Sequence, residues 1–156
     1  MDTYTAFSLL KERLNGIASV FQYTGQYLAD KTKTRYKVPA LYIEFVPNPA
    51  VVNFGKIRCL TYQVNLHYIA QAPFNVADNQ VQQTAMRAHA GKMLDLYNLV
   101  EGMEIGDVQG RLLIGQCLIL NRAPVTYQDT LAVGVLTLQA NLYDYSAAYQ
   151  SIAPKP

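Results

Sequence analysis

The sequence is poor in charge: Asp, Glu, Lys and Arg make up 15% of its 156 residues, well below the roughly 25% of an average soluble domain. It has no tryptophan and only two cysteines, Cys59 and Cys117. Two cysteines without CxxC spacing are too few for the disulfide framework of a small secreted domain, so we expect buried free thiols. The formal net charge of +2 and a pI near 8.5 do not indicate a dedicated nucleic-acid-binding domain, for which a pI above about 9 is usual.

Long apolar runs are also missing. The longest nearly apolar segment, residues 112–120, is broken by Gly115 and Gln116 and is less than half the length that spans a bilayer. The charged residues near the start of the chain interrupt any apolar stretch of the kind a signal peptide needs: Asp2, Lys11, Glu12 and Arg13. These absences predict a soluble intracellular protein.

Motifs for catalysis and cofactor binding are absent as well. The two histidines, His67 and His89, have no HExxH, HxH or Cys/His ligand spacing, and we expect each to be a surface or interface residue. None of the four serines lies in a GxSxG motif, and the glycines form neither GxGxxG nor GxxxxGK[ST]. The sequence therefore predicts a protein that is not an enzyme, with no catalytic residue, cofactor or metal.

What the chain does contain is enough hydrophobic material for a core. Hydrophobic residues make up 51% of the sequence, and 12 of its 17 aromatic residues are tyrosines. Length and composition predict a single domain over residues 1–145, followed by a C-terminal tail, 146–156, that is too short to form an element of its own. A surface with little charge and much tyrosine suits a protein that works against neighbouring subunits.

Two helices are predicted from apolar periodicity. The first spans about Thr5 to Val20, and the second spans about Gln80 to Val100, with Asp78 or Asn79 as its cap. Their expected packing stripes are Phe7, Leu10, Leu14 and Ile17 in the first helix and Met86, Ala90, Met93, Tyr97 and Val100 in the second.

Four strands are predicted. Residues 41–46 are rich in β-formers, and residues 60–68 alternate strictly between apolar and polar side chains. Residues 111–121 read as a nearly continuous apolar strand covered on both faces, and residues 131–145 as a long last strand. The pattern predicts an α+β fold with an antiparallel or mixed twisted sheet of about four to five strands and two main helices packed on one face. Fifteen strand residues would reach about 50 Å, so part of the sheet is expected to project as a β-hairpin.

Charge is concentrated in two segments. Residues 31–58 hold six cations and a single acid, and residues 95–110 hold four acids and no cation. Both segments are interpreted as solvated loops or as complementary patches that meet head to tail between copies of the chain. For the basic segment, a nonspecific contact with a phosphate backbone is a third interpretation. The candidate subunit interface consists of Lys31, Lys33, Arg35, Lys37, Lys56, Arg58, Glu101, Glu104 and Asp107.

In the order and the residue character of its elements, the chain resembles phage tail-terminator and tail-completion (minor tail) proteins. The resemblance covers roughly residues 5–145 and rests on VPALYIEFVP, LTYQVNLHYIAQ, MRAHAGKMLDLYNLV and the closing VLTLQANLYDY. It implies an α+β fold and a homo-oligomeric ring, commonly a hexamer, that caps the tail tube and joins it to the head–tail connector. It implies no active site.

The sequence thus leads to a structural protein of phage or prophage tail morphogenesis. Its expected partners are copies of itself, the tail tube and the head–tail connector, with no membrane. Its expected location is the host cytoplasm during assembly and then the virion tail. Two alternatives stay open: a nucleic-acid-binding module that uses the basic 31–58 segment, and a small-ligand-binding α+β domain with the ligand between helix 80–100 and the sheet.

Overall fold

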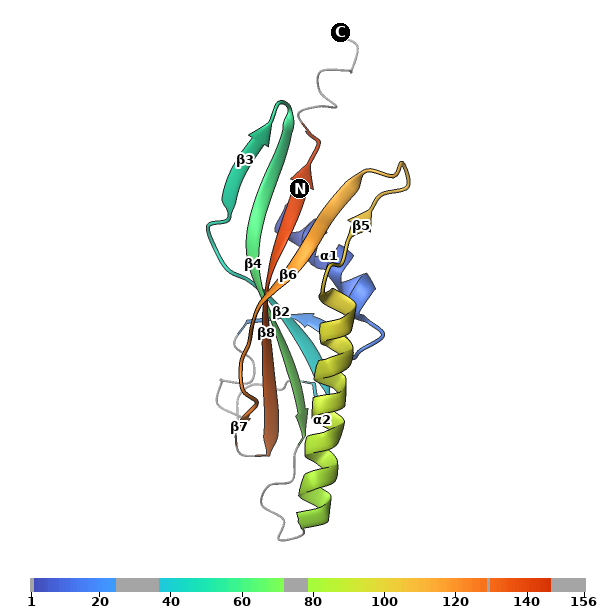
Figure 1. Cartoon of the computed structure of the whole chain (residues 1–156), viewed down its shortest axis with the longest axis vertical. Helices are drawn as coiled ribbons and strands as arrows, with labels where there is room; N and C mark the ends of the chain where they lie inside the picture. Colours follow the sequence, from blue (N-terminus) through green and yellow to red (C-terminus); the bar gives the residue numbers. More distant parts are fainter. Residues whose placement is uncertain (1, 25–36, 72–78, 129, 147–156) are drawn as a thin grey trace.

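A computed structural model describes residues 2–24, 37–71, 79–128 and 130–146. This part of the chain is an α+β fold with two helices and one mixed, curled sheet of eight strands (Figure 1). The elements in chain order are α1 Thr3–Leu14, β1 Ser19–Gln22, β2 Ala40–Phe45, β3 Ala50–Phe54, β4 Ile57–Gln71, α2 Asn79–Val100, β5 Ile105–Gly106, β6 Leu112–Arg122, β7 Thr126–Gln128 and β8 Leu131–Asp144.

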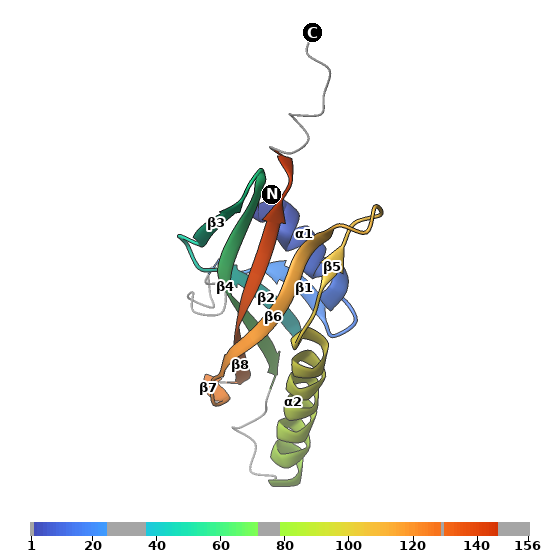
Figure 2. The ribbon, with the colours of Figure 1, turned by 45° about the horizontal axis from the view of Figure 1, so that its top comes forward.

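Strands β4 and β8 are the two long central strands of the sheet. They pair antiparallel along almost their whole length, from Arg58 opposite Asp144 to Gln71 opposite Leu131. The strand order is β1-β2-β4-β8-β6-β5, while β3 pairs with the start of β4 and β7 with the start of β8. All pairs are antiparallel except β1 with β2. We call the end formed by β3, β5, β6 and the adjoining ends of β4 and β8 the upper sheet (Figures 1 and 2).

The two faces of the sheet differ. Val64, Leu66, Leu136 and Leu138 belong to one buried cluster with Leu10, Leu14, Leu96 and Val100 of the two helices; we call this face the core face. Their neighbours along β4 and β8 point to the other side, which we call the open face, because side chains alternate along a strand. The lower end of this face is buried in a second hydrophobic cluster, formed by Ala40, Tyr42, Ile69, Leu131 and Val133, and its upper part is exposed. The alternation predicted for the last strand is confirmed, since all its apolar members are buried: Leu136, Leu138, Ala140 and Leu142.

Helix α1 is shorter than predicted. The Asp2 carboxylate accepts a hydrogen bond from the Thr5 N–H at 2.7 Å and caps its start. The helix ends at Leu14, and the predicted extension to Val20 is wrong. A turn around Gly16 follows, because glycine is a poor helix former, and Val20 is then buried in strand β1.

Helix α2 has almost the predicted bounds, and its predicted stripe is right in the second half only. Met93, Tyr97 and Val100 pack in the core as expected, whereas Met86 is 43% exposed and Ala90 is also exposed. In their place, His89 is buried. The reason lies in strand β8, where Gly134 leaves room for α2: a Cβ atom there would come within 2.6 Å of the Met93 Sδ atom and 2.9 Å of His89.

The four predicted strands are present as β2, β4, β6 and β8, and four further, shorter strands were not predicted. Strands β1, β3, β5 and β7 have five residues or fewer, and the sheet of eight strands exceeds the four to five expected. The expectation that residues 111–121 are covered on both faces is wrong, because Leu118 and Leu120 are about half exposed. Register shifts in β6 on both sides of Leu118 turn these side chains out of the core. Both cysteines are free and buried, as predicted.

Candidate functional site

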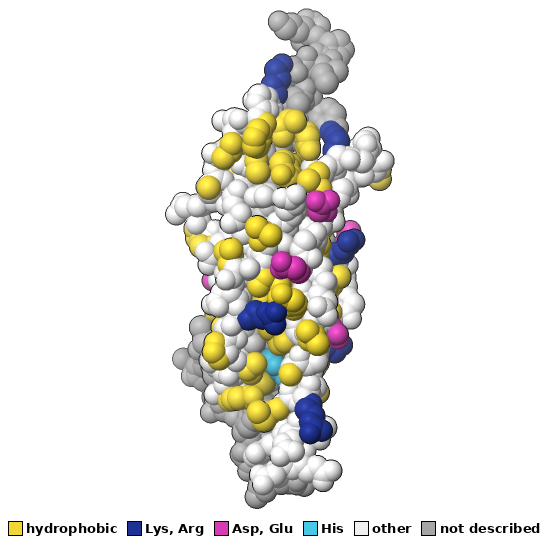
Figure 3. Space-filling view, in the orientation of Figure 1, with side chains coloured by type: hydrophobic (Ala, Val, Ile, Leu, Met, Phe, Trp, Pro, Cys, Tyr) yellow, Lys and Arg dark blue, Asp and Glu magenta, His cyan; other side chains and the backbone are white. Residues whose placement is uncertain are grey.

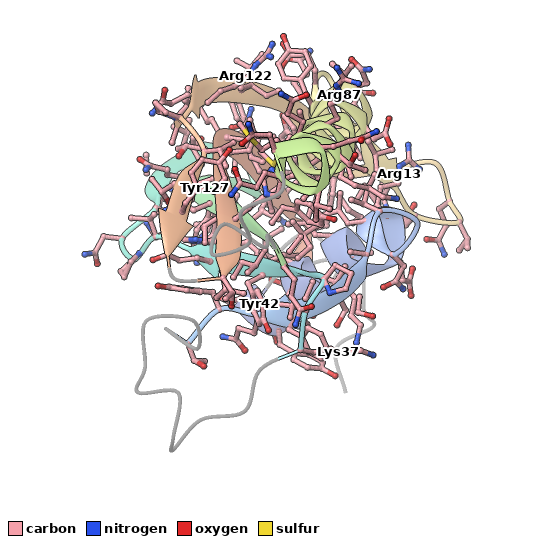
Figure 4. The ribbon with its side chains drawn as sticks, turned by 90° about the horizontal axis from the view of Figure 1, so that it is seen from below. Arg13, Lys37, Tyr42, Arg87, Arg122 and Tyr127 are labelled. Atoms are coloured by element: carbon pink, nitrogen blue, oxygen red, sulfur yellow. The ribbon has the colours of Figure 1, made fainter. Side chains whose placement is uncertain are left out.

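Part of the basic segment lies outside the described residues, namely Lys31, Lys33 and Arg35. Lys37 is exposed just before β2, and its backbone carbonyl accepts a hydrogen bond from the Tyr42 hydroxyl at 2.9 Å. Viewed along the molecule, Lys37 and Tyr42 lie on the side away from Arg87 and Arg122, which are next to α2 (Figure 4). The described end of this segment is therefore anchored to the sheet at β2.

The two remaining predicted cations lie on the β3–β4 hairpin. Lys56 is in its turn and Arg58 is near the start of β4, and both are exposed. Asp144 of β8 lies opposite Arg58 in the sheet register. A hollow of about 260 Å³ at this end is lined by Asn53, Gly55, Lys56, Arg58, Asp144 and Ser146.

The predicted acids lie between α2 and β6. Glu101 follows the last residue of α2, and its Oε2 atom accepts a hydrogen bond from the Ile119 N–H at 3.2 Å. Glu104 precedes strand β5 and is exposed. Both carboxylates are therefore on the β5 side of the upper sheet.

Asp107 differs from the other acids because it has a cationic partner in its own chain. Its Oδ2 atom accepts a hydrogen bond from the Arg111 Nε atom at 2.7 Å, and its Oδ1 atom accepts from the Arg111 N–H at 2.8 Å. Desolvation acts in the opposite direction, but the hydrogen bonds from Arg111 lower the pKa of the Asp107 carboxyl. This pair holds the turn between β5 and β6.

The upper sheet separates the two groups of charge, because three strands, β4, β8 and β6, lie between its edge strands β3 and β5. A row of register partners runs across it from Val51 in β3 through Leu60, Leu142 and Ile114 to Ile105 in β5. Strand β3 is one edge of this row and β5 is the other (Figure 1). Lys56 and Arg58 thus lie at the β3 edge, and Glu101 and Glu104 lie towards the β5 edge.

The open face carries almost no charge. In the described strands, register and alternation place on it amides and hydroxyls along β4 and β8, such as Gln63, Asn65, Thr137 and Gln139, and only one formal charge, Glu44. Apolar side chains gather at its upper end, where Figure 3 shows a hydrophobic patch. Phe54 is 60% exposed and Val52 about half exposed at this end, while Leu118 and Leu120, also about half exposed, lie nearer the middle of the face, close to Gln139. A surface of this kind is typical of an interface.

A hydrogen-bonded network, which sequence reasoning missed, lies in the middle of the open face. The Glu44 Oε2 atom accepts hydrogen bonds from the Asn65 Nδ2 atom at 3.0 Å and from the His67 Nε2 atom at 2.8 Å. The Thr137 hydroxyl donates to the Asn65 Oδ1 atom at 2.9 Å, and the Tyr23 ring stacks on the His67 ring. The only charged residue in the predicted strand 41–46, Glu44, was the signal that could have indicated it.

Both histidines are buried within the chain, at 6% and 3% exposed, whereas surface or interface positions were expected. Burial lowers the pKa of His67, although its hydrogen bond to Glu44 acts in the opposite direction. His89 is buried between α2 and the sheet, where its Nε2 atom lies 3.3 Å from the Tyr68 carbonyl oxygen. Its Nδ1 atom has no hydrogen-bond partner among the described residues, and burial lowers its pKa as well.

A hollow of about 220 Å³ on the open face is lined by side chains that do not titrate: Val46, Pro47, Asn48, Pro49, Thr61, Gln63, Leu120 and Gln139. Within the described part of the chain, no three His, Cys, Asp or Glu side chains are grouped so as to hold a metal ion. At the site proposed for a ligand between α2 and the sheet, Met93 and His89 pack directly against Gly134. No helix among the described residues is long and apolar enough to cross a membrane.

Comparisons with known proteins add no relative: no family model matches the chain, and a search of curated proteins finds no match.

Proposed function

We propose that this chain is a structural subunit of a phage or prophage tail, resembling the tail terminators that form a ring on the tail tube and join it to the head–tail connector. The observation that carries the proposal is the nearly uncharged open face with its exposed apolar end. A sheet face that stays in water is usually rich in charged side chains, whereas this one offers amides, hydroxyls and half-exposed Val, Phe and Leu.

The proposed mechanism is repeated burial of the same two surfaces between copies of the chain. A head-to-tail contact is heterologous, and its rotation angle decides whether the copies close into a ring. The cations at residues 31–37 and at Lys56 and Arg58 would lie towards Glu101 and Glu104 of the next copy, whereas Asp107 is already paired with Arg111 of its own chain. The packing of helices against one face of the sheet would leave the other face for the tail tube, the connector or a neighbouring subunit.

Sedimentation velocity at tens of micromolar, in low and in high salt, tests this proposal. We expect an oligomer in at least one condition, since burial of the uncharged face does not depend on ionic attraction, and ring-shaped particles by negative-stain electron microscopy. A monomer in both conditions would count against the proposed function. Binding to isolated tail tubes would support it further.

A further inference from the structure

We propose that neighbouring copies join by pairing the β3 edge of one upper sheet with the β5 edge of the next, so that the sheet continues from subunit to subunit. This inference rests on the proposed function, because it specifies the contact on which ring formation would depend.

Strand β3 is an unprotected edge. All five of its residues are exposed, and in the described part of the chain it pairs with β4 only. A strand that is paired on one side leaves half of its backbone N–H and C=O groups pointing outwards. Val51 on one face and Phe54 on the other are both more than half exposed. An apolar open edge of this kind either recruits another strand or aggregates.

Topology selects the partner edge. Lys56 and Arg58 are close to the β3 edge, so two β3 edges would bring like charges together. Strands β1 and β2 lie on the same side of β4 as β3, and β7 pairs with the other end of β8, so neither edge can continue the upper sheet from β3. Strand β5 is the edge on the opposite side of the same rows of residues. The β5 edge of a second copy is therefore the surface that continues the sheet.

Strand direction also fits a repeating contact. Each neighbouring pair across the upper sheet is antiparallel, from β3 to β4, β8, β6 and β5. With five strands, the two edge strands run in the same direction. Copies related by rotation about an axis along the strands would therefore pair β3 with β5 in parallel, with their core faces on the same side. Val51 and Ile105, which share one row of the sheet, would then become neighbours across the contact.

Disulfide cross-linking tests this geometry. V51C and I105C are prepared separately, mixed in equal amounts and treated with a mild oxidant, and the wild type serves as the control because Cys59 and Cys117 are buried. We expect covalent dimers in the mixture but not in either variant alone, and a ladder of larger species from V51C/I105C. If V51C alone forms dimers as readily, two β3 edges meet and the inference is wrong. If the protein sediments as an oligomer but the mixture gives no cross-link, the inference fails while the proposed function stands.

Discussion

At the residue scale, Gly134 decides how closely α2 can approach the sheet. A Cβ atom at this position would come within 3.0 Å of atoms of both Met93 and His89. We expect G134A to destabilise the fold by about 1–3 kcal/mol, because a buried side chain would have to shift in a well-packed region. Urea denaturation measures the effect.

Gly91 provides the control for this substitution. It lies on the exposed side of α2, and nothing is within 4 Å of a Cβ atom placed there. G91A should be neutral or should stabilise the protein by up to about 1 kcal/mol, since alanine is the better helix former. An equal loss of stability in both variants would show that Gly134 has no special role.

The two buried histidines should make stability depend on pH. Burial lowers the pKa of both His67 and His89 from the ordinary value of 6.5. Between 6.5 and the lower folded-state pKa, the unfolded chain binds more protons than the folded chain, so stability falls as pH falls. Urea unfolding at pH 7.5, 6.5 and 5.5 should show a progressive decrease, with a smaller decrease for H67Q. Stability that is constant or rises over this range would contradict the expected shifts.

At the element scale, the β3–β4 hairpin depends on its turn. Gly55 has φ 62° and is the first of two residues that connect Phe54 to Ile57, a position where glycine is favoured because other residues rarely adopt positive φ. G55A should weaken the hairpin by about 1 kcal/mol. Hydrogen exchange of the β3 amides measures the loss of protection.

Asparagine is the matched replacement, because its side chain tolerates the left-handed region better than alanine. G55N should therefore retain most of the protection that G55A loses. Similar exchange rates in both variants would mean that the turn does not control the hairpin.

The elements also show what the sequence could predict. Both long strands and the bounds of α2 follow from periodicity, because each buries a continuous set of side chains. Short edge strands such as β5 and β7 carry too few residues for a period to be recognised. The predicted packing stripe of α2 was wrong only at Met86 and Ala90, because the burial of His89 instead depends on Gly134, a residue far away in the sequence.

For the candidate site, the sequence predicted the residue types but not their placement. That Lys56 and Glu104 lie towards opposite edges of one sheet follows from the pairing of β3 with β4 and of β5 with β6, which is tertiary information. The partner of Asp107, Arg111, is four residues away, immediately beyond the acidic segment. Glu44 and His67 come together only because β2 and β4 are neighbours in the sheet.

At the scale of the whole molecule, the low charge content of the sequence is most evident on one surface, the open face of the sheet. The apolar residues of the core face are covered by both helices, while the open face exposes uncharged side chains and the upper sheet ends in two edges of opposite charge. In a monomer, the exposed apolar side chains of this surface would stay in contact with water, which is unfavourable. The proposed assembly would bury the edges and leave the open face to a larger partner.

The long ladder between β4 and β8 has a consequence for the order in which the molecule folds. It joins Arg58 to Asp144 and Gln71 to Leu131, so most of the chain must be present before its central contacts can form. Strand β6 obtains its sheet neighbours from β5 and β8, and β4 needs β8 to complete its second side. We therefore expect the sheet to form late in folding and in one cooperative step, when β8 pairs with β4 and β6. Folding should be slower than in helical proteins of equal length, because contacts between distant residues carry a large loop-closure entropy.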